Sequence, residues 1–282
     1  MMPPPELLPT AAPALPAREA GARAFLATRA TDRIRRMPKR IGVLASGGGS
    51  NLQALYDHLA ALGERRAGEI ALVVSDRAST GALQRATAWG VSTLVVPPAS
   101  PGPALLELLR RHEIDLVVLA GYLKLVPSEV VGAYRGRIVN VHPALLPAFG
   151  GPGMYGGRVH AAVIAQGARV SGVTVHFVDE VYDRGPIVAQ WPVPVLGDDT
   201  AETLARRVLA VEHLLYPRVV QALAARTIRL GADNRALVPL PSAASLHYAL
   251  TSDPGALAAA IDRLWAAGEP PLREASPFFP HP

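Results

Sequence analysis

The sequence contains no cysteine, so disulfide bonds and thiolate metal sites are excluded. Hydrophobic residues make up 50% of its 282 positions, yet no apolar run reaches the roughly 18 residues of a membrane-spanning helix. The longest candidate, "IDLVVLAGYLKLV", is shorter and carries charge. Histidines and carboxylates do not recur at metal-ligand spacing. These absences predict a cytoplasmic protein with no membrane partner and no metal.

Residues 41–282 also lack an excess of basic or acidic side chains. The net charge of +5 and the pI near 9.9 would suggest a nucleic-acid partner. Residues 1–40, however, hold 8 of the 28 basic and 3 of the 23 acidic side chains. Positions 41–282 therefore hold 20 of each, without a run that predicts contact with a phosphate backbone. We expect small-molecule substrates and no nucleic acid.

The composition divides the chain into three parts. Residues 1–37 are rich in proline, alanine and arginine, which is typical of a disordered extension. Translation from Met37 is the simpler alternative, and a targeting leader is another. A catalytic domain is predicted over 38–230, followed by a C-terminal extension over 231–282. A short helix is predicted within that extension, at 254–267.

From Arg40 onward, short β-branched runs alternate with helical stretches. Such runs are typical of strands buried on both faces, and the alternation predicts a doubly wound, mostly parallel, Rossmann-like α/β sheet. A short loop between the last two strands predicts an antiparallel extension of the sheet. The predicted strands span 40–46, 69–75, 92–98, 115–121, 137–142, 171–178 and 186–195, and the predicted helices span 50–63, 80–90, 103–113, 158–167 and 200–224.

A glycine-rich segment follows the first predicted strand. In "IGVLASGGGSNLQAL", three glycines lead to Ser50, Asn51 and a helix. Glycines let the backbone approach an oxyanion, and the first turn of a helix offers it free N–H groups. Because the lysine of nucleoside triphosphate loops is missing, we predict a phosphate monoester near Gly49, Ser50 and Asn51. A tight turn capped by Ser50 is the alternative.

The fifth predicted strand ends on polar residues. In "GRIVNVHPALLPAFGGPGMYGG", Asn140 and His142 are two positions apart, so they share one face of the strand. An amide and an imidazole at a strand end can stabilise an oxyanion and move a proton, as acyl transfer requires. Pro143 ends the pairing and, with Pro147, stiffens the exit. We predict a catalytic pair, with a structural histidine as the alternative.

Carboxylates follow in "VHFVDEVYDRGPIV", between the last two predicted strands. A carboxylate beside His142 would raise the pKa of the imidazole and could position a water for proton transfer. Asp183 is the best candidate because the Arg-Gly-Pro turn after it fixes its backbone. Asp179 and Glu180 are expected to be solvated loop charges, and His176 is expected to pack behind the site.

Four segments together resemble one family. "GVLASGGGSNLQAL", "DLVVLAGYLKLVP", "GRIVNVHPALLPAF" and "VHFVDEVYDRGPIVAQ" are similar to the folate-dependent phosphoribosylglycinamide formyltransferases of purine biosynthesis, in order and spacing, over about residues 38 to 230. The Asn-x-His pair with a later Asp is shared by formyltransferases of this fold, and "SGGGSNL" points to the glycinamide ribonucleotide branch. The resemblance implies a formyltransferase fold and 10-formyltetrahydrofolate as co-substrate. We expect a monomer or a homodimer.

The resemblance also implies roles for individual residues. Asn140 would bind the formyl oxygen of the folate, His142 would donate a proton, and Asp183 would raise the pKa of His142. The implied binding residues are Gly49, Ser50 and Asn51 for the substrate phosphate, Glu212 for its ribose, and Leu123, Lys124, Leu125 and Val126 for the pterin ring.

Two positions depart from the family pattern. Several relatives carry an arginine that contacts the folate tail, but "PPASPGPALLELL" has no basic residue. Lys124 or Arg137 is expected to supply the charge instead. The loop at 150–158 is longer and richer in glycine than in some relatives, which is consistent with a mobile lid or with a variant connection only.

Three other functions share part of the pattern. Methionyl-tRNA formyltransferase has the same catalytic trio but needs a basic C-terminal RNA-binding domain. Formyltetrahydrofolate hydrolase carries an N-terminal regulatory domain, which residues 1–36 are not expected to form. A nucleotide-binding module would not need Asn140, His142 and Asp183 together. The sequence therefore favours the glycinamide ribonucleotide reaction.

Overall fold

The computed structural model describes residues 37–97, 102–237, 259, 261 and 263. All of them except residue 37 belong to one unit, Pro38–Pro282. The predicted N-terminal extension lies outside the described residues up to residue 36. The helix predicted at 254–267 also lies outside them, except at the three isolated positions, each of which is helical.

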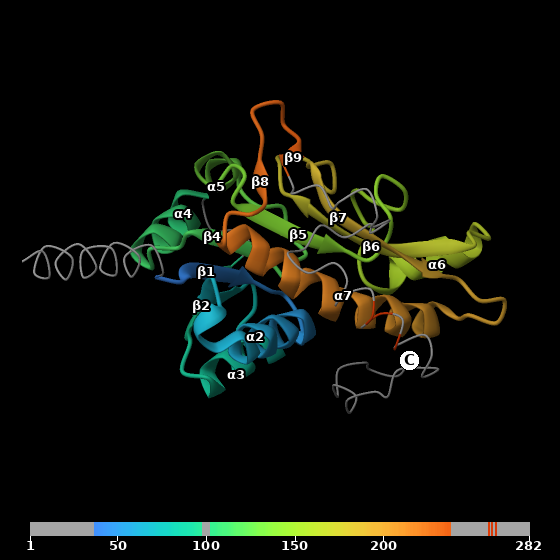
Figure 1. The fold of residues 1–282 in the computed structure, drawn as a ribbon, viewed down its shortest axis with the longest axis horizontal. Coiled ribbons are helices and arrows are strands. Elements are labelled where there is room, and N and C mark those ends of the chain that lie inside the picture. Colours follow the sequence, from blue (N-terminus) through green and yellow to red (C-terminus); the bar gives the residue numbers. More distant parts are fainter. Residues whose placement is uncertain (1–36, 98–101, 238–258, 260, 262, 264–282) are drawn as a thin grey trace, which may run out of the picture. The chain divides into compact units, whose positions relative to one another are not determined.

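A seven-stranded sheet runs through the unit (Figure 1). Its strands lie in the order β3-β2-β1-β4-β5-β6-β7. β1 to β5 are parallel, whereas β6 is antiparallel to both β5 and β7. The predicted fold class and its antiparallel extension are therefore confirmed. The strands are β1 (Lys39–Leu44), β2 (Gly68–Ser75), β3 (Ser92–Val95), β4 (Leu116–Leu119), β5 (Ile138–His142), β6 (Val170–Phe177) and β7 (Ile187–Pro194).

Helices occupy most of the connections between these strands. The longest described helix begins with a capping box, in which the side chains of Thr200 and Thr203 each accept a backbone N–H of the other. None of the described helices is long and apolar enough to cross a membrane. The helices are α2 (Ser50–Leu62), α3 (Gly81–Ala88), α4 (Gly102–Arg111), α5 (Ser128–Ala133), α6 (Gly157–Ala165) and α7 (Ala201–Ala224), with a 3-10 turn at Gly63–Arg65.

The central strands contribute to two separate cores. In β1, Ile41 and Val43 belong to one apolar cluster and Leu44 to the other. β4 divides in the same way, with Val118 in the first cluster and Val117 in the second. Because successive side chains of a strand point to opposite faces, both faces of the sheet need cover. Apolar residues of α2, α3 and α7 complete the first core, and those of α4 and α5 complete the second.

Short elements are where the structure departs from the predicted pattern. α5 has six residues, and a hairpin of β8 (Arg229–Leu230) and β9 (Ala236–Leu237) has two residues in each strand. Neither is long enough to show a period in the sequence. β3 ends at Val95 rather than at residue 98. Pro97 follows closely and has no N–H to continue a ladder.

Candidate active site

The three predicted catalytic residues lie together at the carboxyl end of β5. In the antiparallel register with β6, Asn140 faces His176 and His142 faces Thr174. Asp183 reaches this group from the connection between β6 and β7. One carboxylate oxygen lies 3.5 Å from His142 Nδ1, and the other lies 3.6 Å from His176 Nε2. The sheet therefore brings an amide, two imidazoles and a carboxylate into contact.

Both ring nitrogens of His142 have partners. Nε2 lies 2.9 Å from the carbonyl of Phe149, which can only accept, so this nitrogen carries a proton. Nδ1 faces the Asp183 carboxylate. Burial lowers the pKa of His142, whereas Asp183 and the Phe149 carbonyl raise it and His176 lowers it further. Asp183 thus raises the pKa of His142, as predicted, but desolvation is the larger effect and the pKa lies below its usual value.

Asp183 is held in its ionised form. Burial alone would raise the pKa of this carboxyl, but the neighbouring side chains of His176 and His142 and the Gly151 N–H together lower the pKa below its usual value. The Gly151 N–H donates to Oδ2 at 2.9 Å. The backbone of Asp183 has φ of +55°, which few non-glycine residues adopt. The glycine-rich loop therefore fixes the carboxylate that faces His142.

His176 is buried and packs against the site residues Asn140 and Asp183. Its Nδ1 lies 2.7 Å from the Phe177 carbonyl, and its Nε2 lies 3.2 Å from Asn140 Nδ2. Because a carbonyl can only accept, Nδ1 carries a proton, and in the tautomer with that single proton Nε2 accepts from the Asn140 amide. This bond turns the NH2 group of Asn140 toward the site and leaves its second N–H able to donate to another acceptor.

Two polar residues of β6 and β7 hold the chain where it leaves β5. Thr174 Oγ1 donates to the Ala144 carbonyl at 2.7 Å and accepts the Leu146 N–H at 3.0 Å. Gln190 Nε2 donates both to the Leu146 carbonyl and to Thr174 Oγ1. The sequence pattern pointed to prolines for stiffening this exit. The hydrogen bonds of Thr174 and Gln190 also fix the chain after β5. They could not be predicted without knowing the register of β5, β6 and β7.

His160 is a further buried histidine near His142. It lies in the first turn of α6 and is 4% exposed. Its Nδ1 has no hydrogen-bond partner within the part of the chain that the structure describes. Burial, and then the neighbouring His142, lowers the pKa of His160 to about 4, so the ring is neutral near pH 7. In the sequence it is a lone histidine among apolar helix residues, which carries no functional signal.

The glycine segment leads from β1 into α2 as predicted. Gly49 is the N-cap with φ of +78°, and no side chain caps the helix. A turn capped by Ser50 is therefore wrong, since Ser50 is the first helical residue and is exposed. A Cβ atom at Gly49 would lie 2.8 Å from the backbone of Ala82, so a side chain does not fit. With no acidic residue in its first turn, α2 presents its N–H groups to an anion.

Two predicted substrate residues contact each other. Asn51 Nδ2 donates to Glu212 Oε2 at 2.6 Å, which joins the first turn of α2 to the middle of α7. Burial raises the pKa of Glu212 to about 7, although the Asn51 hydrogen bond lowers it. Asn51 Oδ1 is buried and has no hydrogen-bond partner among the described residues. The site thus contains an unsatisfied acceptor beside the glycine segment, which a ligand hydroxyl or amine would satisfy.

A cavity of about 430 Å³ lies beside the stretch predicted to line the pterin pocket. Its volume is within the range of small-molecule sites. Leu123 and Leu125 are 39% and 46% exposed, whereas Val126 is 3% exposed and belongs to the second core. Leu123 and Lys124 thus line the cavity, whereas Val126 packs in the second core and anchors the stretch. The cavity is lined by Asp76, Arg77, Leu123, Lys124 and Tyr155.

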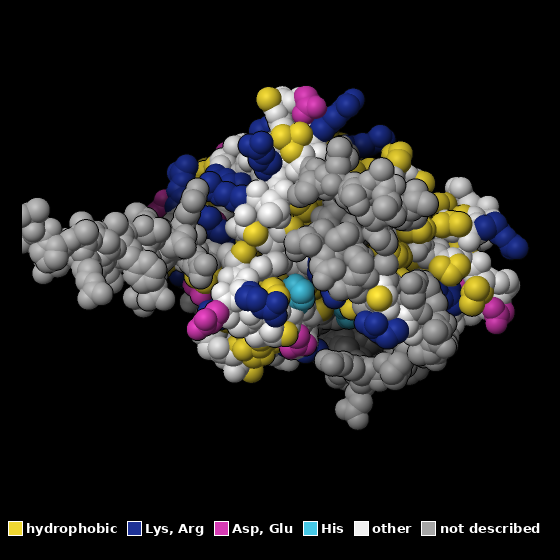
Figure 2. All heavy atoms as spheres, viewed as in Figure 1, with side chains coloured by type: hydrophobic (Ala, Val, Ile, Leu, Met, Phe, Trp, Pro, Cys, Tyr) yellow, Lys and Arg dark blue, Asp and Glu magenta, His cyan; other side chains and the backbone are white. Residues whose placement is uncertain are grey.

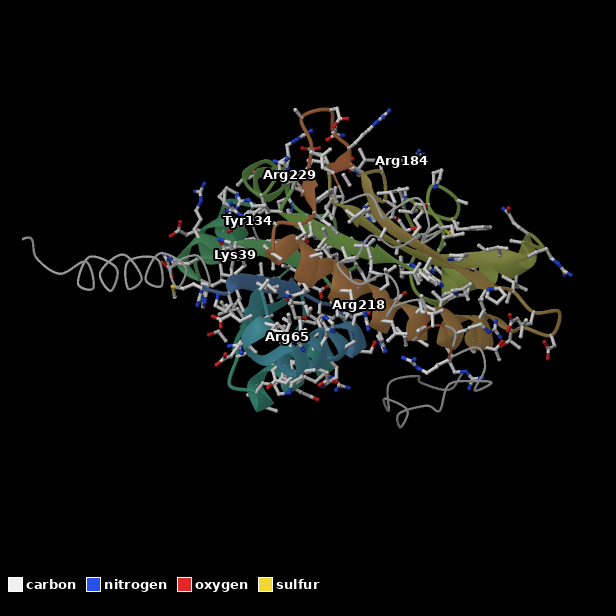
Figure 3. The ribbon with its side chains drawn as sticks, in the orientation of Figure 1. Lys39, Arg65, Tyr134, Arg184, Arg218 and Arg229 are labelled. Carbon is white, nitrogen blue, oxygen red and sulfur yellow. The ribbon has the colours of Figure 1, made fainter. Side chains whose placement is uncertain are left out.

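Arg137 lies at the wrong end of the sheet to contact a ligand of this site. It precedes β5, whose carboxyl end carries His142 five residues later, roughly 16 Å away in an extended strand. Its guanidinium donates to the Ala133 carbonyl at 2.6 Å and lies over the Tyr134 ring at 4.6 Å. Lys39 and Tyr134 mark this amino end in Figure 3. Of the two expected basic contacts, only Lys124 is placed near the cavity.

The remaining charged candidates lie outside this group. Asp179 accepts the Val181 N–H at 3.0 Å in its own loop, and Glu180 is exposed, as predicted. Within the described ranges, no three His, Asp or Glu side chains are arranged to hold a metal ion. On the face drawn in Figure 2, basic and acidic side chains lie at several separate places.

Comparisons with known proteins agree with this geometry. Residues 39–220 match the sequence profile of the formyl transferase family. Phosphoribosylglycinamide formyltransferase of Bacillus subtilis is 38% identical over 203 residues, which cover 70% of this chain and 97% of that protein. The chloroplastic phosphoribosylglycinamide formyltransferase of Vigna unguiculata is 46% identical over 206 residues, and the match spans 71% of this chain but 65% of that protein.

A solved structure shows the same similarity to phosphoribosylglycinamide formyltransferases. Glycinamide ribonucleotide transformylase 1 from Symbiobacterium toebii is 41% identical to this chain and superimposes with a TM-score of 0.65. The superposition covers 71% of this chain and 93% of that one.

Proposed function

The chain belongs to the formyl transferase family, and we propose that it transfers a formyl group from 10-formyltetrahydrofolate to the amine of N1-(5-phospho-D-ribosyl)glycinamide. This reaction belongs to purine biosynthesis. The observation that carries the proposal is the convergence of Asn140, His142 and Asp183 at one strand end, at the edge of the parallel sheet from which the uncapped helix α2 also begins. An acyl transfer between a phosphorylated amine and a bulky donor needs both features.

The polar residues at the end of β5 would act on the formyl group that 10-formyltetrahydrofolate supplies. Asn140 has one N–H engaged by His176 and a second that can donate to the formyl oxygen. His142, when protonated, brings a positive charge to the same end of β5, which would stabilise the negative charge that develops on this oxygen. Asp183 stabilises that protonated form and can take the proton released by the attacking amine, directly or through a water. The proton would then pass to the folate nitrogen as the bond between that nitrogen and the formyl carbon breaks.

The phosphorylated substrate would lie along the N-terminus of α2. The N–H groups of Gly49, Ser50 and Asn51 would hold the phosphate, since no side chain caps this helix. The Asn51 and Glu212 pair would contact the ribose, with the buried Asn51 Oδ1 accepting a hydroxyl. These contacts anchor one end of the substrate and so orient its amine.

The folate would lie against the stretch from Leu123 to Val126. Leu123 is exposed toward the cavity and offers apolar surface to a ring, while Lys124 offers a charge to the carboxylates of the glutamate tail. We further propose a catalytic domain over 38–230, a cytoplasmic location, no metal in the reaction, and a monomer or homodimer without a nucleic-acid partner.

An absorbance assay of folate deformylation, run with and without the ribonucleotide amine, tests the proposal. We expect turnover only when the amine is present. Equal turnover without it would support a hydrolase, and no turnover in folded protein with both substrates would contradict an enzyme of this class. Asn140→Ala should reduce turnover roughly 100- to 1000-fold, as the loss of one oxyanion donor typically does.

A further inference from the structure

Arg85 projects from α3 onto the glycine segment that precedes α2. Its Nε–H donates to the Gly48 carbonyl at 3.1 Å, and Nη1 donates to Gln53 Oε1 at 2.6 Å. Gln53 lies in the first turn of α2, so one guanidinium joins the glycine segment to the helix that follows it. Among the sequence patterns considered above, none singles this arginine out.

The orientation of Gln53 is fixed at both ends of its amide. Its Nε2 donates to Asp57 Oδ1 at 2.9 Å, so its oxygen is the atom that accepts from Arg85. The backbone N–H of Gln53 also donates to the Gly49 carbonyl at 2.9 Å. Gln53 thus donates to Asp57, and Arg85 donates to both Gln53 and Gly48. The hydrogen bonds to Gln53 and Gly48 together fix the position of the guanidinium.

Backbone packing holds the same segment against the start of α3. The Ala82 N–H donates to the Gly47 carbonyl at 3.2 Å. A Cβ atom at Gly81 would lie 2.7 Å from the Gly48 carbonyl oxygen, as close as the one at Gly49 would lie to Ala82. The backbone of the glycine segment is therefore in contact with the start of α3, and the Arg85 hydrogen bond to Gly48 strengthens that contact. A small shift of α3 would displace the N–H groups that begin α2.

The charge of Arg85 is not offset by these hydrogen bonds, since both acceptors are neutral. The guanidinium has five N–H donors, of which these two bonds use two. Its positive charge therefore adds to the positive end of the α2 dipole, at the place where the chain lacks the lysine of a nucleotide-binding loop. Position and charge both favour an anion at this point.

We propose that Arg85 is the positioning residue for the phosphate of the ribonucleotide substrate: it fixes Gly48 relative to α2 and strengthens the local positive field. This inference rests on the proposed function. Because the phosphate is remote from the reacting atoms, Arg85 affects binding of the ribonucleotide and not the chemical step.

The test compares Arg85→Met, which removes charge and donors but keeps an apolar stem, with Arg111→Met. Arg111 lies on α4 and pairs with Glu107 on the surface, so it serves as a matched control. We expect Arg85→Met to raise KM for the ribonucleotide roughly tenfold, equivalent to about 1.4 kcal/mol, with kcat and the folate KM unchanged. Arg85→Lys, which keeps the charge, should recover part of the loss. A KM equal to that of Arg111→Met, or an effect on kcat alone, would overturn the proposal.

A second measurement separates this inference from the proposed function. Inorganic phosphate at constant ionic strength should raise the thermal midpoint of the wild-type and Arg111→Met proteins, but not that of Arg85→Met. If wild-type protein shows no ribonucleotide-dependent transfer, the proposed function fails, while this phosphate test still decides the role of Arg85. If Arg85→Met does not fold, Gln53→Leu removes one of the two bonds. An unchanged phosphate effect in that variant would contradict the proposal.

Discussion

Glu212 should make the protein less stable as the pH rises. The carboxyl is 6% exposed, and burial raises its pKa from 4.5 to about 7. A buried acid with a raised pKa binds its proton more tightly in the folded state, so folding becomes less favourable as the pH rises from the unfolded pKa through the folded one. Relative to a carboxyl with an unshifted pKa, the raised pKa lowers the free energy of unfolding by about 3 kcal/mol above pH 8. At pH 5 it lowers the free energy of unfolding by about 1 kcal/mol.

Glu212→Gln should remove this penalty and keep an acceptor for Asn51 Nδ2. At pH 8.5 the thermal midpoint of the variant should lie roughly 6 to 12 °C above that of the wild type. At pH 5 the difference should be roughly 2 to 4 °C. Calorimetric melts of both proteins at the two pH values measure this, with Glu64→Gln, an exposed carboxylate in the 3-10 turn, as control. The same difference in midpoint at pH 5 and pH 8.5 would refute the reasoning.

Three further predictions concern the end of β5. Asp183→Asn should lower the pKa of His142 further, since the carboxylate raises it, and should reduce kcat roughly 100-fold; an unchanged imidazole titration by NMR would contradict this. His176→Phe should reduce kcat about tenfold with little change in KM, because the Asn140 amide loses its acceptor; normal kcat would show that the bond does not orient the amide. Gly150→Ala would place a methyl group against Leu146 Cδ2 and 3.2 Å from Asp183 Cβ. It should reduce kcat about tenfold, measured together with the thermal midpoint; normal turnover would show that the loop tolerates the shift.

Much of the fold could be predicted because its elements are long enough to show a period. The seven strands of the main sheet and five of its helices lie where the apolar runs place them, and the rule that ligands bind at carboxyl strand ends leads directly to Asn140 and His142. α5 and the β8–β9 hairpin are too short for that signal. Their position depends on packing against the sheet and not on their own sequence.

The parts of the site that escaped prediction depend on register and burial. His176 reaches Asn140 because the antiparallel pairing of β5 with β6 sets them opposite each other, which no local pattern specifies. The pKa of His142 is lowered by desolvation, which a sequence does not reveal. Arg85 acts across two helices whose contact is decided by where glycine permits close approach. Residue types could thus be assigned to the site, but not the distances between them.

The most direct test of the formyl transfer follows the fate of the formyl carbon. The protein would be incubated with the ribonucleotide amine and folate carrying a 13C-labelled formyl group, and the products would be observed by NMR. The account predicts that the label appears as a formamide on the glycinamide nitrogen, in equal amount to the tetrahydrofolate formed. Label recovered as free formate, with the ribonucleotide amine unchanged, would contradict it.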